Sequence, residues 1–268
     1  MRLLDSIEEK YGFNMHTQCK VNYEFLTVWR EMCDIYVDDV YLTAAVKFIL
    51  ACCIADKILD SKRFVQDEKE SVSGMLMHIR ENNYQIAQTE RFNELGILFN
   101  EIFHVIYSIW DEDLKQMLIN KIERAFRSED FMWRYKLTDV SERDIDFSLL
   151  VDKSIEFESA ALLLSISQEY NNKYVSCANL IGKIFAMVDD MCDFIEDIKN
   201  NRINSILYWN RFNCDNTLEN RIDSVVDNME SFIAKLDSAI TELKAHVSDD
   251  AYYYIMGMIK EWCLIIPQ

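Results

Sequence analysis

Two groups of aspartates stand in stretches of sequence that otherwise have the pattern of a buried helix. The first group lies in 46-VKFILACCIADKILD-60, where steps of four residues lead from apolar side chains to Asp56 and Asp60. Residues four apart share one face of a helix, so both carboxylates continue a small and apolar stripe. A solvated helix face is polar along its whole length and does not have this pattern. We therefore treat these two acids as candidates for chemistry.

The second group lies in 181-IGKIFAMVDDMCDFIEDIKNNRINSIL-207, where Asp189, Asp193 and Asp197 follow one another at steps of four. The helical rise puts neighbouring carboxylates of this column about 6 Å apart. Unpaired carboxylates at buried positions are costly, so the column is expected to bind cations. Hard oxygen ligands suit Mg²⁺, which keeps several waters and takes further ligands from substrate phosphates. Arg202 follows closely and is positioned to meet an anionic substrate.

A plainer interpretation is that both groups are helix ends in solvent, with their acids paired to neighbouring Lys and Arg. Acidic residues make up 46 of the 268 positions, so an isolated D-x-x-x-D pattern has little meaning in this chain. This chain instead has two groups of aspartates, each at the end of a strongly apolar stretch with helical periodicity. That pairing favours the metal site over the plainer interpretation.

The elements that carry these residues are predicted to be helices only. The chain has 5 Gly and 1 Pro, too few for the many tight turns of a sandwich, a barrel or a doubly wound sheet. No internal repeat and no Pro/Gly/Ser-rich linker divides it, so residues 1–268 are expected to form one all-α domain. Apolar periodicity predicts helices over 22–36, 41–61, 67–82, 89–108, 112–135, 144–169, 174–200, 218–246 and 249–265.

Charge and cysteine content narrow the function classes. The chain has 28 basic and 46 acidic residues, a net charge of −18, which disfavours nucleic acid and anionic membrane surfaces as partners. The eight cysteines show no zinc-type pairing and are expected to be reduced thiols. No apolar stretch is long enough to span a membrane, and the first residues lack the pattern of a signal peptide. We expect a cytoplasmic protein.

The two acidic groups together resemble the aspartate motifs of the class I isoprenoid synthase superfamily. That superfamily includes trans-prenyltransferases, squalene and phytoene synthases and class I terpene cyclases. The run G-x-x-F-x-x-x-D-D-x-x-D-x-x-x-D, from Gly182 to Asp197, is similar to the second prenyltransferase motif, and its acids also match the ligand triad of terpene cyclases. Asp56 and Asp60 match the first and last acids of the first motif. The resemblance implies a helical bundle with an active-site cavity in its centre.

Departures from the family motifs indicate which branch of the superfamily the sequence resembles. The first motif is DKILD, in which Lys57 replaces the second acid, and no Arg-Arg-Gly follows it. Ala186 stands where chain-elongating enzymes have Gln. The missing groups help to bind a second diphosphate, so the resemblance implies a terpene synthase, a carbon–oxygen lyase acting on one allylic diphosphate. Prenyl transfer, including chain elongation and head-to-head coupling, stays open as an alternative, and Lys57 leaves room for a catalytically silent homologue.

The resemblance also implies a mechanism and a set of residues. Three Mg²⁺ ions would hold the diphosphate of a C15 to C35 substrate while the allylic C–O bond ionises, and apolar walls would shield the carbocation. A homodimer is left open. The implied metal ligands are Asp56, Asp60, Asp189, Asp193 and Asp197, of which the first four are also catalytic. Asp190 would either stand behind these ligands or bind a metal ion through water. Arg134, Lys153 and Arg202 would bind diphosphate, with Arg143 as a less favoured alternative, and Phe157 and Phe185 would line the hydrocarbon pocket.

Overall fold

The fold is all-α throughout the part of the chain that we describe. A computed structural model describes residue 9 and residues 15–36, 39–77, 92–136, 147–167, 171–208 and 218–264. Over these residues there are nine α-helices, one short 3-10 helix and no strand. The helices are α2 (Met15–Met32), α3 (Val40–Asp60), α4 (Gln66–Met77), α5 (Asn93–Tyr107), α6 (Glu112–Arg134), α7 (Phe147–Ser165), α8 (Lys173–Lys199), α9 (Leu218–His246) and α10 (Asp249–Leu264), with the 3-10 helix η4 (Ser205–Tyr208) after α8.

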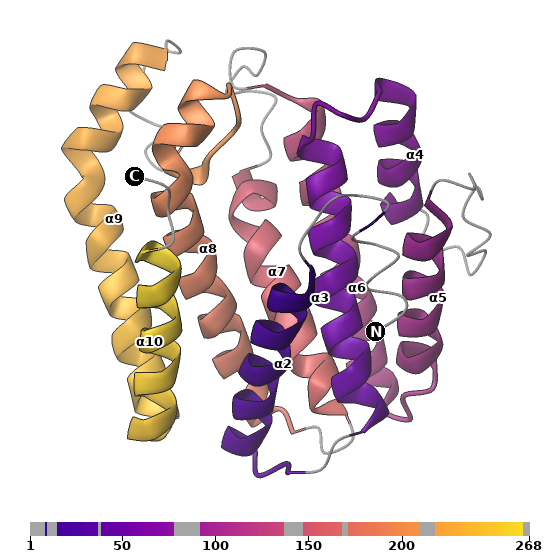
Figure 1. The fold of residues 1–268 in the computed structure, drawn as a ribbon. Coiled ribbons are helices and arrows are strands. Elements are labelled where there is room, and N and C mark those ends of the chain that lie inside the picture. Colours follow the sequence, from indigo (N-terminus) through magenta and orange to yellow (C-terminus); the bar gives the residue numbers. More distant parts are fainter. Residues whose placement is uncertain are drawn as a thin grey trace.

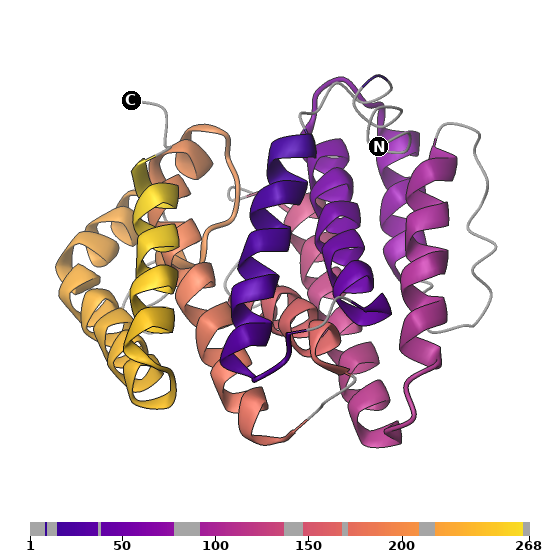
Figure 2. The same ribbon diagram turned by 60° about the horizontal axis from the view of Figure 1, so that its bottom comes forward.

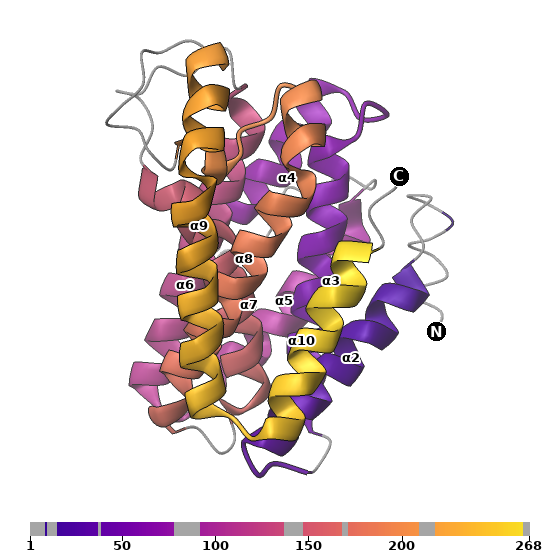
Figure 3. The same cartoon turned by 90° about the vertical axis from the view of Figure 1, so that its left-hand side faces the viewer.

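The helices lie side by side in a bundle whose centre is formed by α3 and α7. Helix α7 contacts α2, α3, α6 and α8, while α4 and α5 lie on one flank and α9 and α10 on the other (Figure 1). Turning the bundle shows the same order, with α9 and α10 packed beside α8 (Figure 2). The view onto that flank shows α9 and α10 lying over the central helices (Figure 3). The C-terminal ends of α3 and α8, which carry the two acidic groups, lie at the same end of the bundle, at the top of Figure 1.

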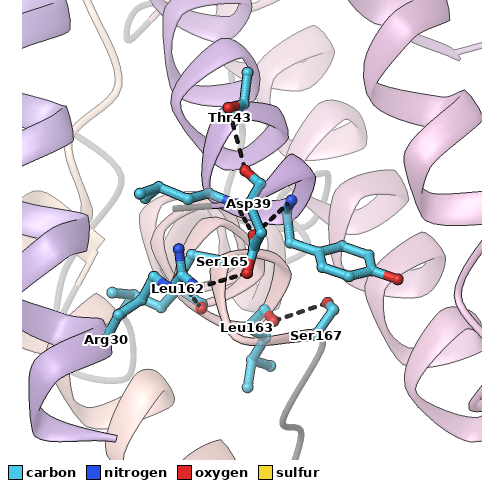
Figure 4. Close-up of polar contacts among 9 residues, drawn as sticks. Arg30, Asp39, Thr43, Leu162, Leu163, Ser165 and Ser167 are labelled. Carbon is cyan, nitrogen blue, oxygen red and sulfur yellow. Dashed lines mark hydrogen bonds and ion pairs between the residues drawn. The ribbon is translucent and has the colours of Figure 1, made fainter. Parts of the chain in front are cut away.

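Helix α3 is central because its sequence is apolar on every side. Buried side chains occur all round it, from Leu42 to Leu59. Its first turn is closed by Asp39, whose carboxylate accepts from the backbone amides of Tyr41 at 2.8 Å and Leu42 at 3.0 Å. The same carboxylate accepts from Arg30 Nη2 at 2.6 Å, and that guanidinium is only 2% exposed (Figure 4). One buried ion pair therefore joins the end of α2 to the start of α3.

A second polar cluster joins α6, α7 and α8, the last of which carries the second acidic group. The ammonium of Lys121 on α6 donates to Glu156 of α7 at 2.7 Å, to Ser159 at 3.0 Å and to Asn179 of α8 at 2.9 Å. Lys121 and Glu156 are both largely buried, and all three hydrogens of the ammonium are used. Since Lys121 lies on α6 and its partners lie on α7 and α8, the cluster fixes the register of these three helices relative to one another.

Helices α7 and α8 approach closely at Gly182, the glycine that opens the second aspartate motif. A Cβ atom placed on Gly182 would lie 2.7 Å from the carbonyl oxygen of Ile155, which belongs to the backbone of α7. Backbone cannot move away as a flexible side chain can, so only glycine permits this helix spacing. The spacing in turn sets the distance of the aspartates of α8 from the centre of the bundle.

Gly182→Ala is expected to lower the free energy of unfolding by about 1 to 3 kcal/mol, because the added methyl group overpacks the contact between α7 and α8. Gly257→Ala is the matched control, since its Cβ would meet nothing within 4 Å on α10. There the substitution is expected to stabilise by about 0.5 to 1 kcal/mol, through the better helix propensity of alanine. Urea unfolding of both variants checks the contrast. Equal effects at the two positions would contradict the close approach.

The helices predicted from apolar periodicity correspond to the helices observed, with one clear error. The prediction of 218–246 agrees with α9 at both ends, and 249–265 agrees with the start of α10. The prediction of 22–36 is wrong: α2 begins seven residues earlier, at Met15, and ends at Met32. Residues 15–21 are largely polar and carry no apolar stripe, so periodicity could not find that extension. Parts of 67–82, 89–108 and 144–169 lie outside the described residues. No helix in the described ranges has both the length and the apolar content needed to cross a membrane.

Candidate functional site

A cavity of about 240 Å³ opens at the end of the bundle where α3 and α8 finish. Helices α3, α6, α7 and α8 and the turn after α8 all contribute to its wall. The lining residues are Asp56, Asp60, Glu129, Met132, Trp133, Ile155, Lys183, Ala186, Met187, Asp189, Asp190, Asp193, Asp197, Arg202, Ile203 and Ser205. Residues far apart in the sequence therefore meet at one place.

All five acids expected as metal ligands are among the lining residues. Asp56 and Asp60 come from α3, and the column Asp189, Asp193 and Asp197 comes from α8. Their burial is graded: Asp56, Asp189 and Asp197 are half-buried, whereas Asp60 and Asp193 are exposed. The carboxylates thus stand around an opening that a ligand can enter.

Arg202 links the two acidic groups directly. It follows α8 in the chain, and its Nη2 lies 3.0 Å from Asp60 Oδ2 at the end of α3. Both side chains are more than one third exposed, so the pair adds little to stability. The ion pair matters for geometry, because it places the guanidinium of Arg202, five residues after the second motif, on Asp60 of the first motif.

A second cation, that of Lys69 on α4, stands beside this ion pair. Its ammonium donates to the carbonyl of Leu59, near the end of α3. Burial and the neighbouring Arg202 lower the pKa of Lys69, and the charge of Asp60 acts in the opposite direction. Lys69, Asp60 and Arg202 therefore form a group of alternating charge, of which Asp60 and Arg202 line the cavity.

The residues present fit Mg²⁺. Every candidate ligand is a carboxylate, the hard oxygen donor that Mg²⁺ prefers, and the donors come from two facing helices. No three His, Cys, Asp or Glu side chains among the described residues converge closely enough to hold an ion by themselves. Mg²⁺ sites of this kind commonly use one or two carboxylates and complete the shell with water and substrate phosphate.

Glu158 of α7 stands next to this acid-lined wall, and it was not singled out from the sequence. Burial, and after it the charge of Asp189, raise the pKa of the Glu158 carboxyl to about 7. The same carboxylate and Asp56 act on Cys53, whose pKa rises to about 12 mainly through burial. The thiol of Cys53 is therefore protonated near neutral pH and is not a nucleophile. Among the groups that line or adjoin the cavity, the carboxylates are therefore the candidates for chemistry.

Glu158→Gln is expected to stabilise the metal-free protein at alkaline pH. A carboxyl group whose pKa is raised on folding binds a proton that the unfolded chain releases, so wild-type stability falls as pH rises from about 4.5 to 7. The amide does not titrate, so the variant should gain about 2 to 3 kcal/mol on wild type between pH 4.5 and pH 8. Urea unfolding in EDTA at both pH values measures this, with the exposed Glu242→Gln as control. A gain that is the same at both pH values would contradict the assignment.

The remaining predicted residues lie elsewhere. Arg134 is exposed, pairs with Asp130 at 2.7 Å and stacks over Trp133, and it is not among the lining residues. Phe185 packs edge-on against Phe25 at 5.5 Å, and Phe157 packs against Phe48 at 5.4 Å. Phe185 belongs to the core, and Phe157 is partly buried and packs against it, so neither lines the cavity. Arg143 and the side chain of Lys153 lie outside the described residues.

Several lining residues were not predicted. Trp133 and Met132 provide the apolar surface that Phe157 and Phe185 were expected to provide, and Glu129 and Lys183 add charge. Glu158, which adjoins the cavity, had a signal in the sequence, since Glu156 and Glu158 are the two acids of the largely apolar run 155-IEFESAALLLSI-166. Glu129 had none, because the segment of α6 around it is rich in charged residues.

Comparison of the sequence with protein-family models and with curated proteins finds no match to either.

Proposed function

We propose that this protein is a Mg²⁺-dependent class I terpene synthase, which ionises an allylic isoprenyl diphosphate, cyclises the carbocation and releases diphosphate. One observation carries the proposal: acids of two motifs 133 residues apart line a single cavity, with Arg202 bridging from one motif to the other. Two unrelated helix ends in solvent would have no reason to meet in this way. The resemblance of both motifs to isoprenoid synthases supports the same assignment.

The charge of the cavity supports a cation-dependent reaction. Seven carboxylates line it against two cationic side chains, so the wall carries a surplus of five negative charges when all are ionised. A diphosphate would be repelled by such a wall unless divalent cations came with it. Asp56 and Asp60 on one side and Asp189, Asp193 and Asp197 on the other would hold these ions. When bound, Mg²⁺ would supply electrostatic stabilisation of the charge that develops on the leaving diphosphate.

The chain's own residues would bind and orient the substrate. Arg202 lines the cavity beside Asp60, where it can balance the charge of a phosphate. Met132, Trp133 and Ile155 provide apolar surface in the lining, which would exclude water from the hydrocarbon chain. The face of Trp133 would also stabilise positive charge on carbon, as aromatic faces do.

Prenyl transfer is the second candidate, and one residue favours it. Lys183 lines the cavity more than two helical turns before Asp193, on the same helix. A cation at that position is unexpected in a pocket for a hydrocarbon alone, and it would suit the anionic group of a second substrate. In that case Lys183→Met would raise the KM for the acceptor and leave the KM for the allylic diphosphate unchanged.

Product analysis separates the two candidates. The protein is incubated with Mg²⁺ and C10, C15, C20 or C25 allylic diphosphate, and the organic extract is examined by mass spectrometry. A hydrocarbon or alcohol with the carbon number of the substrate supports the cyclase. Product that forms only when isopentenyl diphosphate is added supports transfer. If no product forms under either condition, both enzymatic candidates are rejected and a catalytically silent homologue is the remaining alternative.

A further inference from the structure

The chain reverses direction immediately after α8 and returns along it. Asn201 has φ of 58°, the left-handed conformation that commonly ends a helix. The backbone amide of Arg202 then donates to the carbonyl of Asp197 at 2.8 Å, and that of Asn201 to Ile198 at 3.1 Å. These bonds close the end of α8 and turn residues 202–205 back against its last two turns. The returning segment can therefore contact the acids that α8 presents.

Asn204 is the centre of this returning segment. It is fully buried, and its side-chain amide donates to the carbonyl of Asp190 at 2.8 Å and to Asp197 Oδ2 at 2.9 Å. Its oxygen accepts from the backbone amide of Ile206 at 3.1 Å. Both hydrogens and the oxygen of the amide are thus engaged. Because one bond goes to the backbone of α8 and one to the carboxylate, the amide holds that carboxylate at a fixed angle to the helix.

The next residue acts on a second acid in the same way. The hydroxyl and the backbone amide of Ser205 both donate to Asp190 Oδ2, the amide at 3.3 Å. Asp190 is therefore held by the returning segment. Two consecutive residues thus contact two acids of one motif, almost two turns apart on α8.

We propose that Asn204 is a positioning residue, which orients Asp197 for cation binding through the hydrogen bond from its amide. This inference rests on the proposed function, because it assigns Asp197 as a metal ligand. Asp197 stands in the last turn of α8, where a carboxylate without a partner would sample several rotamers. Outer partners that orient metal ligands typically change metal affinity 10- to 100-fold when they are removed. The motif that binds the cation therefore extends from Asp189 to Ser205.

A double-mutant cycle on metal affinity tests this role. Mn²⁺ replaces Mg²⁺, since it also prefers carboxylates, and the electron paramagnetic resonance of free Mn²⁺ gives binding in the presence of inorganic diphosphate. Asn204→Ala is expected to weaken Mn²⁺ binding about 10- to 100-fold. In an Asp197→Ala background the same substitution should cause no further loss, because the ligand it orients is absent. Asn200→Ala, an exposed asparagine of the same turn, is the matched control and should bind Mn²⁺ as wild type does.

The outcomes are distinct. Independent losses that multiply in the double variant, or a folded Asn204→Ala protein with wild-type affinity, would overturn the positioning role. If Asn204→Ala does not fold, Asn204→Ser is used in the same cycle, because its hydroxyl can accept from the amide of Ile206 but cannot reach both acceptors on α8. Absence of Mn²⁺ binding by the wild-type protein would instead reject the proposed function, and this inference with it.

Discussion

Replacing Asp189 with asparagine is expected to reduce Mg²⁺-dependent release of diphosphate by at least about a hundredfold. Asp189 lines the same cavity as the acids of α3, and its charge acts on the carboxyl group of Glu158. The amide keeps the shape of the side chain and removes its charge. Loss of one preorganised group that stabilises developing charge typically lowers the rate 10²- to 10³-fold. Colorimetric detection of inorganic diphosphate measures the effect.

Asp237→Asn is the control for this substitution. It makes the same chemical change on the exposed face of α9 and should leave the release of diphosphate unchanged. Thermal unfolding of both variants shows whether they remain folded. If the Asp189→Asn protein is folded and has wild-type activity, the aspartates of α8 do not have the proposed role in diphosphate release.

The second large effect concerns stability. Asp39→Ala is expected to lower the free energy of unfolding by about 3 to 5 kcal/mol, since it leaves the buried guanidinium of Arg30 without its counter-ion. The cost is high because Arg30 Nε already has no hydrogen-bond partner, so loss of Asp39 also removes the partner of Nη2. Loss of the α3 cap adds about 1 kcal/mol to this. Urea unfolding gives the total.

Two further variants separate the ion pair from the cap. Asp39→Asn keeps a good capping side chain, so its difference from Asp39→Ala measures the cap alone. Adding Arg30→Met to Asp39→Asn removes the unpaired charge and should recover most of the lost stability, because apolar replacement of a buried ion pair is often neutral. A double variant no more stable than Asp39→Asn would show that the charge is not the cause.

The class of fold could be predicted from the sequence because it depends on properties that are local. Scarce Gly and Pro excluded sheets, and apolar periodicity located helices such as α9 to the residue. The start of α2 could not be predicted, since its first seven residues carry no apolar stripe. The close contact at Gly182 could not be predicted either, because it depends on the backbone of another helix.

The sequence predicted the aspartates that line the cavity, but not the other lining residues of α6 and α8. Four residues make slightly more than one helical turn, so a column read at steps of four drifts about 40° per step around the helix. The residues of α8 that line the cavity instead form a stripe wider than one column: Lys183, Ala186, Met187, Asp189, Asp190, Asp193 and Asp197. Phe185 lies to one side of that stripe and packs into the core. Extending the column back from Asp189 therefore selected Phe185 and missed Lys183.

The most direct test of the proposed terpene synthase activity is the release of inorganic diphosphate from a single allylic diphosphate, measured with Mg²⁺ and with EDTA. The wild-type protein is given C10, C15, C20 and C25 substrates in turn, with no second substrate present. Release is expected from at least one chain length, and it should require Mg²⁺ and stop when EDTA is added. No release from any single substrate would contradict the proposed activity, and so would release that EDTA leaves unchanged.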